Sequence, residues 1–273
     1  MTGHSVTSIC RALRSSRATF YRELGPRPRH YRRQDDALVY GQLCAVLRDR
    51  GSYGYRRGRV LVNREFGTDY NRKRIQRVMR LTGLAVPIRG RRRNRRAHRG
   101  RIACLGSNQR WCSDVFEIVC WNGEVVSVAF ALDCCDREAI AYEATRRDML
   151  GDDIRRLMRR AVFARFGTER PSNRVQWLSD NGGIYTALET VIEAEKQGLV
   201  PITTPVASPE SNGMAESFVN TMRRDYVDGA DLSSSDRVIE QLRAWIDDYN
   251  GFAPHSALGD RSPVEYRREL VTT

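Results

Sequence analysis

The sequence predicts an α/β domain, a mixed sheet flanked by helices, preceded by an all-α region with a helix-turn-helix layout. Three strand-like segments follow one another after residue 106, and strands then alternate with helices, which is the order of a mixed sheet. Ahead of them, apolar residues recur only at helical spacing. The chain has 273 residues, enough for about two domains.

The first 88 residues are predicted to be helical. Residues 5–23 are expected to form a short helical pair, within an N-terminal segment at 1–30. Further helices are expected from Asp36, over 56–65 after a glycine-rich turn, and from the capping residue Asn71, with Gly67 as a stop. Helix, turn and basic helix is the layout of a helix-turn-helix module.

The third of these helices turns Ile75, Val78 and Met79 inward and leaves its cations largely free. Those cations are Arg72, Lys73, Arg74, Arg77 and Arg80. We therefore assign 31–88 as a helix-turn-helix-like DNA-binding domain, with Arg72, Lys73 and Arg77 as DNA contacts. A small three-helix bundle with an ordinary charged surface is the alternative.

The net charge of +13, from 46 basic and 33 acidic residues, favours an acidic partner. Nearly all the cations are arginine, which either reflects codon usage in a GC-rich genome or serves bidentate contact with phosphate. Residues 89–101 hold eight arginines and no acid. We interpret 89–105 as a linker that also contacts a nucleic-acid backbone, although a plain solvated linker is possible. Its expected DNA contacts are Arg91, Arg92, Arg93, Arg95 and Arg96.

The second half of the chain supplies the sheet. Strands are predicted over 111–119, 125–132, 139–144, 175–178 and 199–202, and helices from Leu150 to Val162 and over 187–196. We place this domain at 106–228 and a helical extension of it at 229–273. The extension carries an apolar stripe of a kind that is more often core than interface: Val238, Ile239, Leu242, Trp245, Ile246 and Tyr249.

Several protein classes are excluded by composition. The longest nearly apolar stretch, Val125–Leu132, is too short to cross a bilayer, and the first thirty residues lack the apolar block of a secretory signal. The seven cysteines are odd in number and contain no Cys-x-x-Cys pair, which argues against a disulfide scaffold or zinc ribbon. We expect a reduced, cytoplasmic protein without a membrane partner.

Three acids stand out by their context. Asp114 lies inside the first strand, where a carboxylate is costly without ionic or metal partners. Asp180 follows a buried strand and precedes two glycines, at the kind of strand end where ligands bind. Glu216 lies on a helix capped by Ser211 or Asn212 and points away from the apolar stripe. Asn220 and Arg223 point almost the same way, so one helical face carries an acid, an amide and a cation.

Such a set suits phosphoryl transfer. Two Mg²⁺ ions about 3.5–4 Å apart hold the attacking and leaving oxygens of a phosphodiester. Mg²⁺ prefers oxygen ligands and keeps several waters, so two or three carboxylates suffice, and Arg223 and Asn220 would then contact the DNA. Each acid also has an ordinary explanation: a capped turn for Asp114, an Asx-turn for Asp180 and a surface position for Glu216.

The motifs around these acids are Trp111-Cys-Ser-Asp114, Ser179-Asp-Asn-Gly182 and residues 208–218, which include Glu216. Together they resemble the DDE core of OrfB-type transposases from the IS-three family of insertion sequences, which are relatives of retroviral integrases. The 35 residues between Asp180 and Glu216 match that family's interval. Segments 107–114 and 130–138 are most similar to the IS-two subgroup. The upstream segments 51–57 and 71–80 and the C-terminal segments 249–250, 254–259 and 261–263 extend the resemblance over residues 5–268.

The resemblance implies a ribonuclease H-like fold, divalent metal (usually Mg²⁺, with Mn²⁺ as a substitute), and Asp114, Asp180 and Glu216 as catalytic metal ligands. It implies cleavage at the ends of the element, its terminal inverted repeats, and transfer of the new 3′-hydroxyl to target DNA. Asp133 matches a recurrent non-catalytic position and is left out with Asp136. Arg223 stands where the family carries Lys or Arg, and it keeps the charge with a different geometry.

The resemblance also implies partners. A homo-multimer on DNA is expected because two ends must meet, in a protein that works at the bacterial nucleoid. The family often fuses an upstream reading frame of OrfA type, and this chain looks like the downstream partner alone. Two other functions stay open: a helix-turn-helix regulator with a non-catalytic core, and a ribonuclease H-like nuclease that only hydrolyses.

Overall fold

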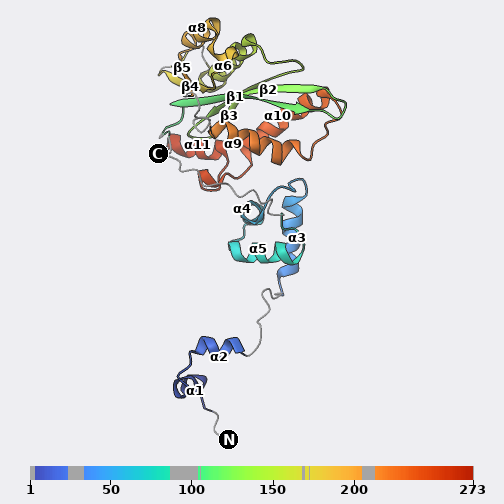
Figure 1. Cartoon of the computed structure of the whole chain (residues 1–273), viewed down its shortest axis with the longest axis vertical. Coiled ribbons are helices and arrows are strands. Elements are labelled where there is room, and N and C mark those ends of the chain that lie inside the picture. Colours follow the sequence, from blue (N-terminus) through green and yellow to red (C-terminus); the bar gives the residue numbers. More distant parts are fainter. Residues whose placement is uncertain are drawn as a thin grey trace. The chain divides into compact units, whose positions relative to one another are not determined.

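The computed structural model describes residues 4–23, 34–86, 104, 106–167, 170–171, 173–204 and 213–272 (Figure 1). The proposed arginine contacts at 91–96 and the proposed helix caps at 211–212 lie outside these residues. The chain divides into two compact units. A helical unit comprises Met1–Arg48 and Gly54–Ala85, and a sheet unit comprises Asp49–Tyr53 and Val86–Thr273.

The helical unit contains the helices that the sequence predicts. They are α1 (Val6–Ala12), α2 (Arg17–Glu23), α3 (Asp36–Leu47), α4 (Tyr55–Phe66) and α5 (Arg72–Leu81). The last three pack around one apolar core of Val39, Leu43, Val62, Ile75, Val78 and Met79. The connection from α4 to α5 is built as expected, because Gly67 ends α4 with a positive φ of 59° and the Asn71 side chain accepts the Arg74 N–H.

The expectation of free cations on α5 is wrong for two of them. Arg77 donates to Asp36 at 2.6 Å, and both side chains are largely buried. Arg74 pairs with Asp35 and lies over the Tyr70 ring. The helical spacing did not show that the acids at the start of α3 face α5, since that depends on tertiary packing. Arg72, Lys73 and Arg80 are exposed, as predicted.

The sheet unit is built on a five-stranded mixed sheet, which confirms the predicted fold class. Its strands are β1 (Arg110–Val119), β2 (Val125–Asp133), β3 (Ala139–Thr145), β4 (Val175–Ser179) and β5 (Leu199–Thr203). The order is β3-β2-β1-β4-β5. β1 pairs antiparallel with β2 and parallel with β4, so it lies at the centre of the sheet.

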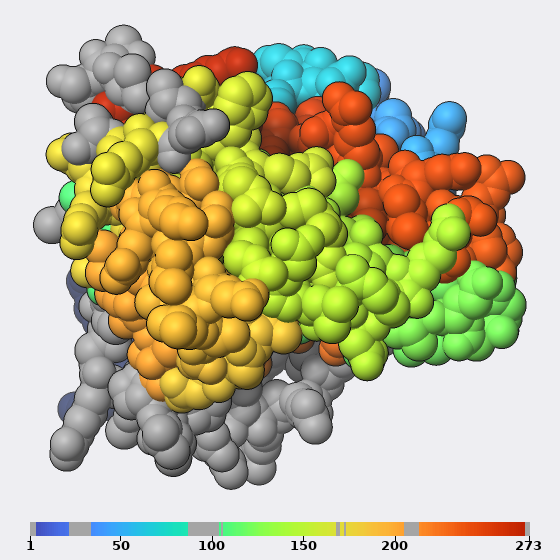
Figure 2. Space-filling view, turned by 90° about the horizontal axis from the view of Figure 1, so that it is seen from above, coloured from blue at the N-terminus to red at the C-terminus, as the bar shows by residue number. Residues whose placement is uncertain are grey.

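Helices cover both faces of this sheet (Figure 1). On one face, α6 (Gly151–Phe166) and α8 (Leu188–Lys196) pack side by side, and Figure 2 views this face, with α6 in yellow-green and α8 in gold. On the other face lie α9 (Gly213–Met222) and α10 (Ser235–Gly251), followed by α11 (Pro263–Thr272). In the described part of the chain, no helix combines the length and apolar character needed to span a bilayer.

Side chains of β1 alternate between these two layers. Cys112, Phe116 and Ile118 belong to the core under α9 and α10. Trp111 and Val115 belong to the core under α6 and α8. Because strand side chains alternate, Asp114 faces the α9 layer and Ser113 faces the α6 layer.

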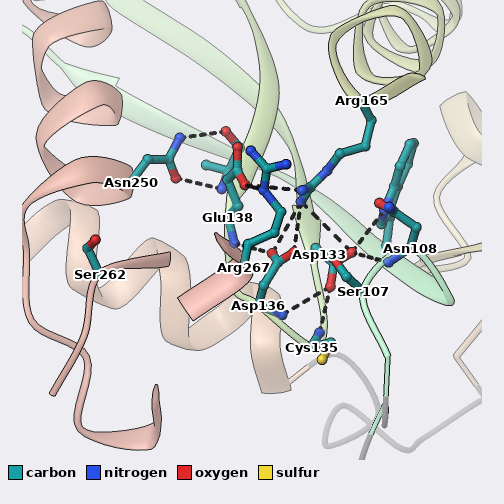
Figure 3. A network of polar contacts seen from close by, with 12 residues as sticks. Ser107, Asn108, Asp133, Cys135, Asp136, Glu138, Arg165, Asn250, Ser262 and Arg267 are labelled. Carbon is teal, nitrogen blue, oxygen red and sulfur yellow. Dashed lines mark hydrogen bonds and ion pairs between the residues drawn. The ribbon is translucent and has the colours of Figure 1, made fainter. Parts of the chain in front are cut away.

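The apolar stripe of the C-terminal extension is core. Val238, Leu242 and Tyr249 of α10 are buried against the sheet. The Asn250 amide donates to the carbonyl of Ala139 and accepts its N–H, at 2.9 and 2.8 Å, which fastens the end of α10 to β3 (Figure 3). His255 contacts the Tyr249 ring edge-on at 4.7 Å between centroids.

Glu124, in the turn between β1 and β2, accepts the N–H of Ser235 at the start of α10 at 2.8 Å. The backbone and side chain of Ser235, with Asn122, lower the pKa of Glu124 from 4.5 to about 2. A lowered carboxyl pKa contributes stability that is present above the unfolded value and is lost as the pH falls toward the folded value.

Replacing Glu124 by Gln should therefore remove part of the acid sensitivity. We expect the free energy of unfolding of the wild type to fall relative to Glu124→Gln as the pH drops from about 4.5 to about 2. Urea denaturation across that range measures it, with Glu117→Gln, on the same hairpin, as control. If the difference in free energy of unfolding between the wild type and Glu124→Gln is the same at every pH, the lowered pKa of Glu124 is contradicted.

Candidate active site

Asp114 lies in the middle of β1 and is half-buried. It stands opposite Phe130 of β2, and residues opposite each other in an antiparallel pair share a face of the sheet. The Phe130 ring contacts the Phe218 ring of α9 at 4.4 Å between centroids. Asp114 therefore lies on the face that α9 covers.

Asp180 comes directly after β4 and is exposed. Its Oδ1 accepts the N–H of Gly182 at 3.0 Å, so the Asx-turn considered from the sequence is present. A Cβ on Gly182 would lie 2.9 Å from that oxygen, so a larger residue there would displace the Asp180 carboxylate. The turn orients the carboxylate rather than burying it.

Asp114 and Asp180 each come two residues after the paired positions Cys112 and Leu178 of the parallel strands β1 and β4, so they lie on neighbouring segments of the sheet unit. Burial raises the pKa of Asp114, and the negative charge of Asp180 raises it further, while the N–H of Val115 opposes both effects. Two carboxylates that repel each other in a partly buried place suit a hard cation, since oxygen donors and a compensating charge are what Mg²⁺ requires.

Glu216 lies on α9, whose buried side holds Ala215, Phe218 and Met222. Glu216 itself is exposed, as are Asn220 and Arg223, which agrees with the predicted polar face. Arg223 opens the π-helical turn η2 (Arg223–Val227).

Asp114, Asp180 and Glu216 do not form a preassembled three-carboxylate site. Among the described residues, no group of three or more His, Cys, Asp or Glu side chains is placed to share a metal ion. Asp114 and Asp180 each come two residues after the paired positions Cys112 and Leu178 of β1 and β4, and Glu216 lies on α9, which packs against β1.

Sequence reasoning missed the short helix α7 (Gly183–Thr186), which follows the Asx-turn of Asp180. Its Tyr185 is buried and shares a hydrogen bond of 2.9 Å with the Ser113 hydroxyl, next to Asp114. Four residues are too few for a helical pattern to be visible. The one feature of the sequence that could have indicated this contact is Ser113, a polar residue at a core position of β1.

Three family models match the chain. A model described as an HTH-like domain matches residues 42–92. Two models described as integrase core domains match residues 105–209 and 197–263. The first falls mostly within the helical unit, and the other two cover the sheet, Asp114, Asp180 and Glu216.

Similar proteins include Transposase InsD for insertion element IS2A/D/F/H/I/K from Escherichia coli. It is 42% identical over 285 residues, which cover 98% of this chain and 92% of that protein. InsD for insertion element IS2-9 from E. coli strain K12 is also 42% identical, with 90% of its length covered. Among solved structures, the cryo-EM structure of a simian T-cell lymphotropic virus intasome with PP2A regulatory subunit B56 gamma has a TM-score of 0.50 at 17% identity. The match covers 60% of this chain and little more than half, 56%, of that one, and it supports the fold.

Proposed function

This chain belongs to the IS-three family of insertion-sequence transposases, and we propose that its sheet unit cuts DNA at the ends of the element and joins each new 3′-hydroxyl to a target phosphodiester. It is a DNA transposase by relationship to InsD over 98% of its length. The observation that supports the proposed chemistry is that Asp114 and Asp180 follow the paired positions Cys112 and Leu178 of β1 and β4, with Asp114 on the face of the sheet that α9 covers.

We assign Asp114, Asp180 and Glu216 as the ligands of divalent metal, with Mg²⁺ as the ion and Mn²⁺ as a substitute. Such ions, when bound, activate the attacking hydroxyl and stabilise the leaving oxygen of the phosphodiester. The carboxylates of Asp114 and Asp180 would bind the ion, and Glu216 would complete the set from α9.

The remaining polar face of α9 is suited to the DNA backbone. Asn220 and Arg223 are exposed on the side that also carries Glu216. An arginine there would donate to phosphate oxygens in fork geometry and hold the scissile strand against the carboxylates. In cutting, the oxygen of water would form a bond to phosphorus as the bond to the element's 3′-oxygen breaks; in joining, that 3′-hydroxyl would form a bond to a target phosphorus as a target P–O bond breaks. In each step the proton that the nucleophile loses is balanced by protonation of the departing oxygen.

Removing metal tests this function. With DNA that carries the element's ends, we expect cutting and joining in Mg²⁺ or Mn²⁺, and loss of both in a chelator. Gel analysis of the products separates joining from cutting alone, which is the outcome for a nuclease. DNA binding without any metal-dependent product would instead support the regulator.

We propose that Arg72 and Lys73 of α5 contact DNA phosphates and that the linker arginines make further phosphate contacts. Arg77 would also contact a phosphate, once its ion pair with Asp36 opens. The chain has two lysines, Lys73 on α5 and Lys196 at the end of α8, which offer a matched pair.

We expect Lys73→Ala to weaken DNA binding at low salt and to reduce the slope of log affinity against log salt by about 0.9, the share of one phosphate contact. Lys196→Ala should leave the slope unchanged. Fluorescence anisotropy over a salt series measures both. Equal slopes for Lys73→Ala and wild type would remove α5 from the DNA interface.

The partners follow from the same reaction. Joining two ends to one target requires copies of this chain to meet on DNA, so we propose a homo-multimer on the terminal inverted repeats, acting at the nucleoid in the cytoplasm. We further propose that an OrfA-type upstream product, separate or fused, assists in recognising the ends.

A further inference from the structure

Asp114 and Asp180 lie where the sheet no longer fixes their separation. β1 and β4 pair in register from Arg110 with Gln176 to Cys112 with Leu178. Both aspartates come two residues after the last of these pairs, so the ladder described for the two strands ends before it reaches them. The pairing brings the two segments side by side, and contacts beyond it adjust the distance between the carboxylates.

Ser113 and Tyr185 provide such a contact from the opposite layer. Ser113 precedes Asp114 and is completely buried, and its Oγ lies 2.9 Å from the Tyr185 hydroxyl. The Tyr185 N–H donates to the Gly182 carbonyl at 3.0 Å. Gly182 in turn donates its N–H to Asp180 Oδ1, also at 3.0 Å. Three hydrogen bonds therefore join β1 beside Asp114 to the carboxylate of Asp180.

We propose that Ser113 and Tyr185 are positioning residues, whose hydrogen bond holds the Asp114 and Asp180 carboxylates at the separation that a shared divalent cation requires. The inference rests on the proposed function of this site. Groups that orient metal ligands from behind govern metal affinity although they do not touch the metal.

The surroundings of Tyr185 suit this role. Its ring is buried in the core beneath α6 and α8, where a phenylalanine ring would fill the same space. Burial raises the pKa of the Tyr185 hydroxyl, the hydrogen bond with Ser113 lowers it, and the charges of Asp114 and Asp180 raise it further, so the hydroxyl stays protonated. The ring serves packing, and the hydroxyl remains available to fix the geometry.

The test uses Tyr185→Phe and Ser113→Ala, which remove the two ends of one hydrogen bond. Mn²⁺ binding is measured by calorimetry on the full chain without DNA, and strand transfer is measured as a function of Mn²⁺ concentration. We expect each variant to raise the Mn²⁺ dissociation constant by about 10- to 100-fold. Transfer should approach the wild-type rate at saturating Mn²⁺, and the double variant should be no worse than either single variant.

Thr190→Val is the matched control. Thr190 is buried on α8, and its hydroxyl donates to the Ile184 carbonyl at 3.0 Å, so the variant loses a buried hydrogen bond to the same segment. It should lower thermal stability while its Mn²⁺ affinity stays at the wild-type value. A loss of Mn²⁺ affinity in Thr190→Val equal to that in Tyr185→Phe would reduce the role of Tyr185 to stability and overturn the inference.

Asp114→Asn and Asp180→Asn separate this inference from the function on which it rests. If both bind Mn²⁺ as well as the wild type, the proposed metal site is wrong, and the positioning role is wrong with it. If both lose Mn²⁺ affinity while Tyr185→Phe and Ser113→Ala keep it, the metal site stands and only the positioning role is overturned.

Discussion

Asp114→Asn, Asp180→Asn and Glu216→Gln should each reduce strand transfer by about a thousandfold or more. A bound metal ion stabilises the transition state by several kcal/mol, and each 1.4 kcal/mol corresponds to a factor of ten in rate. An amide keeps the shape of the carboxylate and removes the charge that binds the ion. Transfer is measured on DNA with the element's ends, at saturating Mg²⁺.

Folding and DNA affinity distinguish a catalytic effect from a structural one. Asp180 and Glu216 are exposed and Asp114 is only half-buried, so each variant should fold and bind DNA like the wild type. Glu117→Gln, an exposed acid of the same strand as Asp114, should retain full transfer. Near-normal transfer by any one of the three variants contradicts its assignment as a ligand.

Arg165→Met should destabilise the sheet unit by about 3–5 kcal/mol, because it leaves buried carboxylates without their cation. Arg165 lies on α6 with 3% of its side chain exposed. It donates to Asp136 at 3.1 Å and to Glu138 at 3.1 Å, as Figure 3 shows. Asp133 and Asp136 are completely buried.

The contacts around Arg165 form a network of buried polar groups, which explains its large expected contribution to stability. Asp133 accepts the N–H groups of Asn108 and Cys135 at 2.7 Å, and burial with the nearby charge of Asp136 raises its pKa. Arg267 of α11 also donates to Glu138, at 2.6 Å. The network thus joins the segment before β1, the end of β2, α6 and α11.

Denaturation by urea measures the effect of Arg165→Met on the free energy of unfolding. Arg243→Met, at an 85% exposed arginine paired with Asp247, is the matched control and should change stability by no more than about 1 kcal/mol. Adding Asp136→Asn to Arg165→Met should recover part of the lost free energy of unfolding, since Asp136→Asn removes one unpaired charge. Equal stability of Arg165→Met and Arg243→Met contradicts this role.

The order of elements was predictable from the sequence because each is long enough to show its period. The alternation of β1, the buried run of β2 and the stripe on α10 were all visible, and α10 is core as its spacing favoured. The helix α7 was not predicted, because its four residues are too few to show a helical spacing of apolar residues. Leu150, expected inside α6, is instead its N-cap and is exposed.

The site was predictable in part, for a different reason. Asp114 and Asp180 stand out because a charge inside a strand and a charge at a strand end are unusual places for acids. Their approach depends on the parallel pairing of β1 with β4, which joins residues more than sixty positions apart. Asp133 resembles them in the sequence, and only the structure shows that Arg165 and backbone N–H groups account for its charge.

The central claim is that Asp114, Asp180 and Glu216 share divalent cations. A crystal of the protein grown or soaked with Mn²⁺, measured by anomalous scattering at the manganese edge, tests this most directly. We expect manganese between the carboxylates of Asp114 and Asp180, with Glu216 of α9 as a further ligand. Manganese bound elsewhere, with these three side chains turned to separate regions, would contradict it.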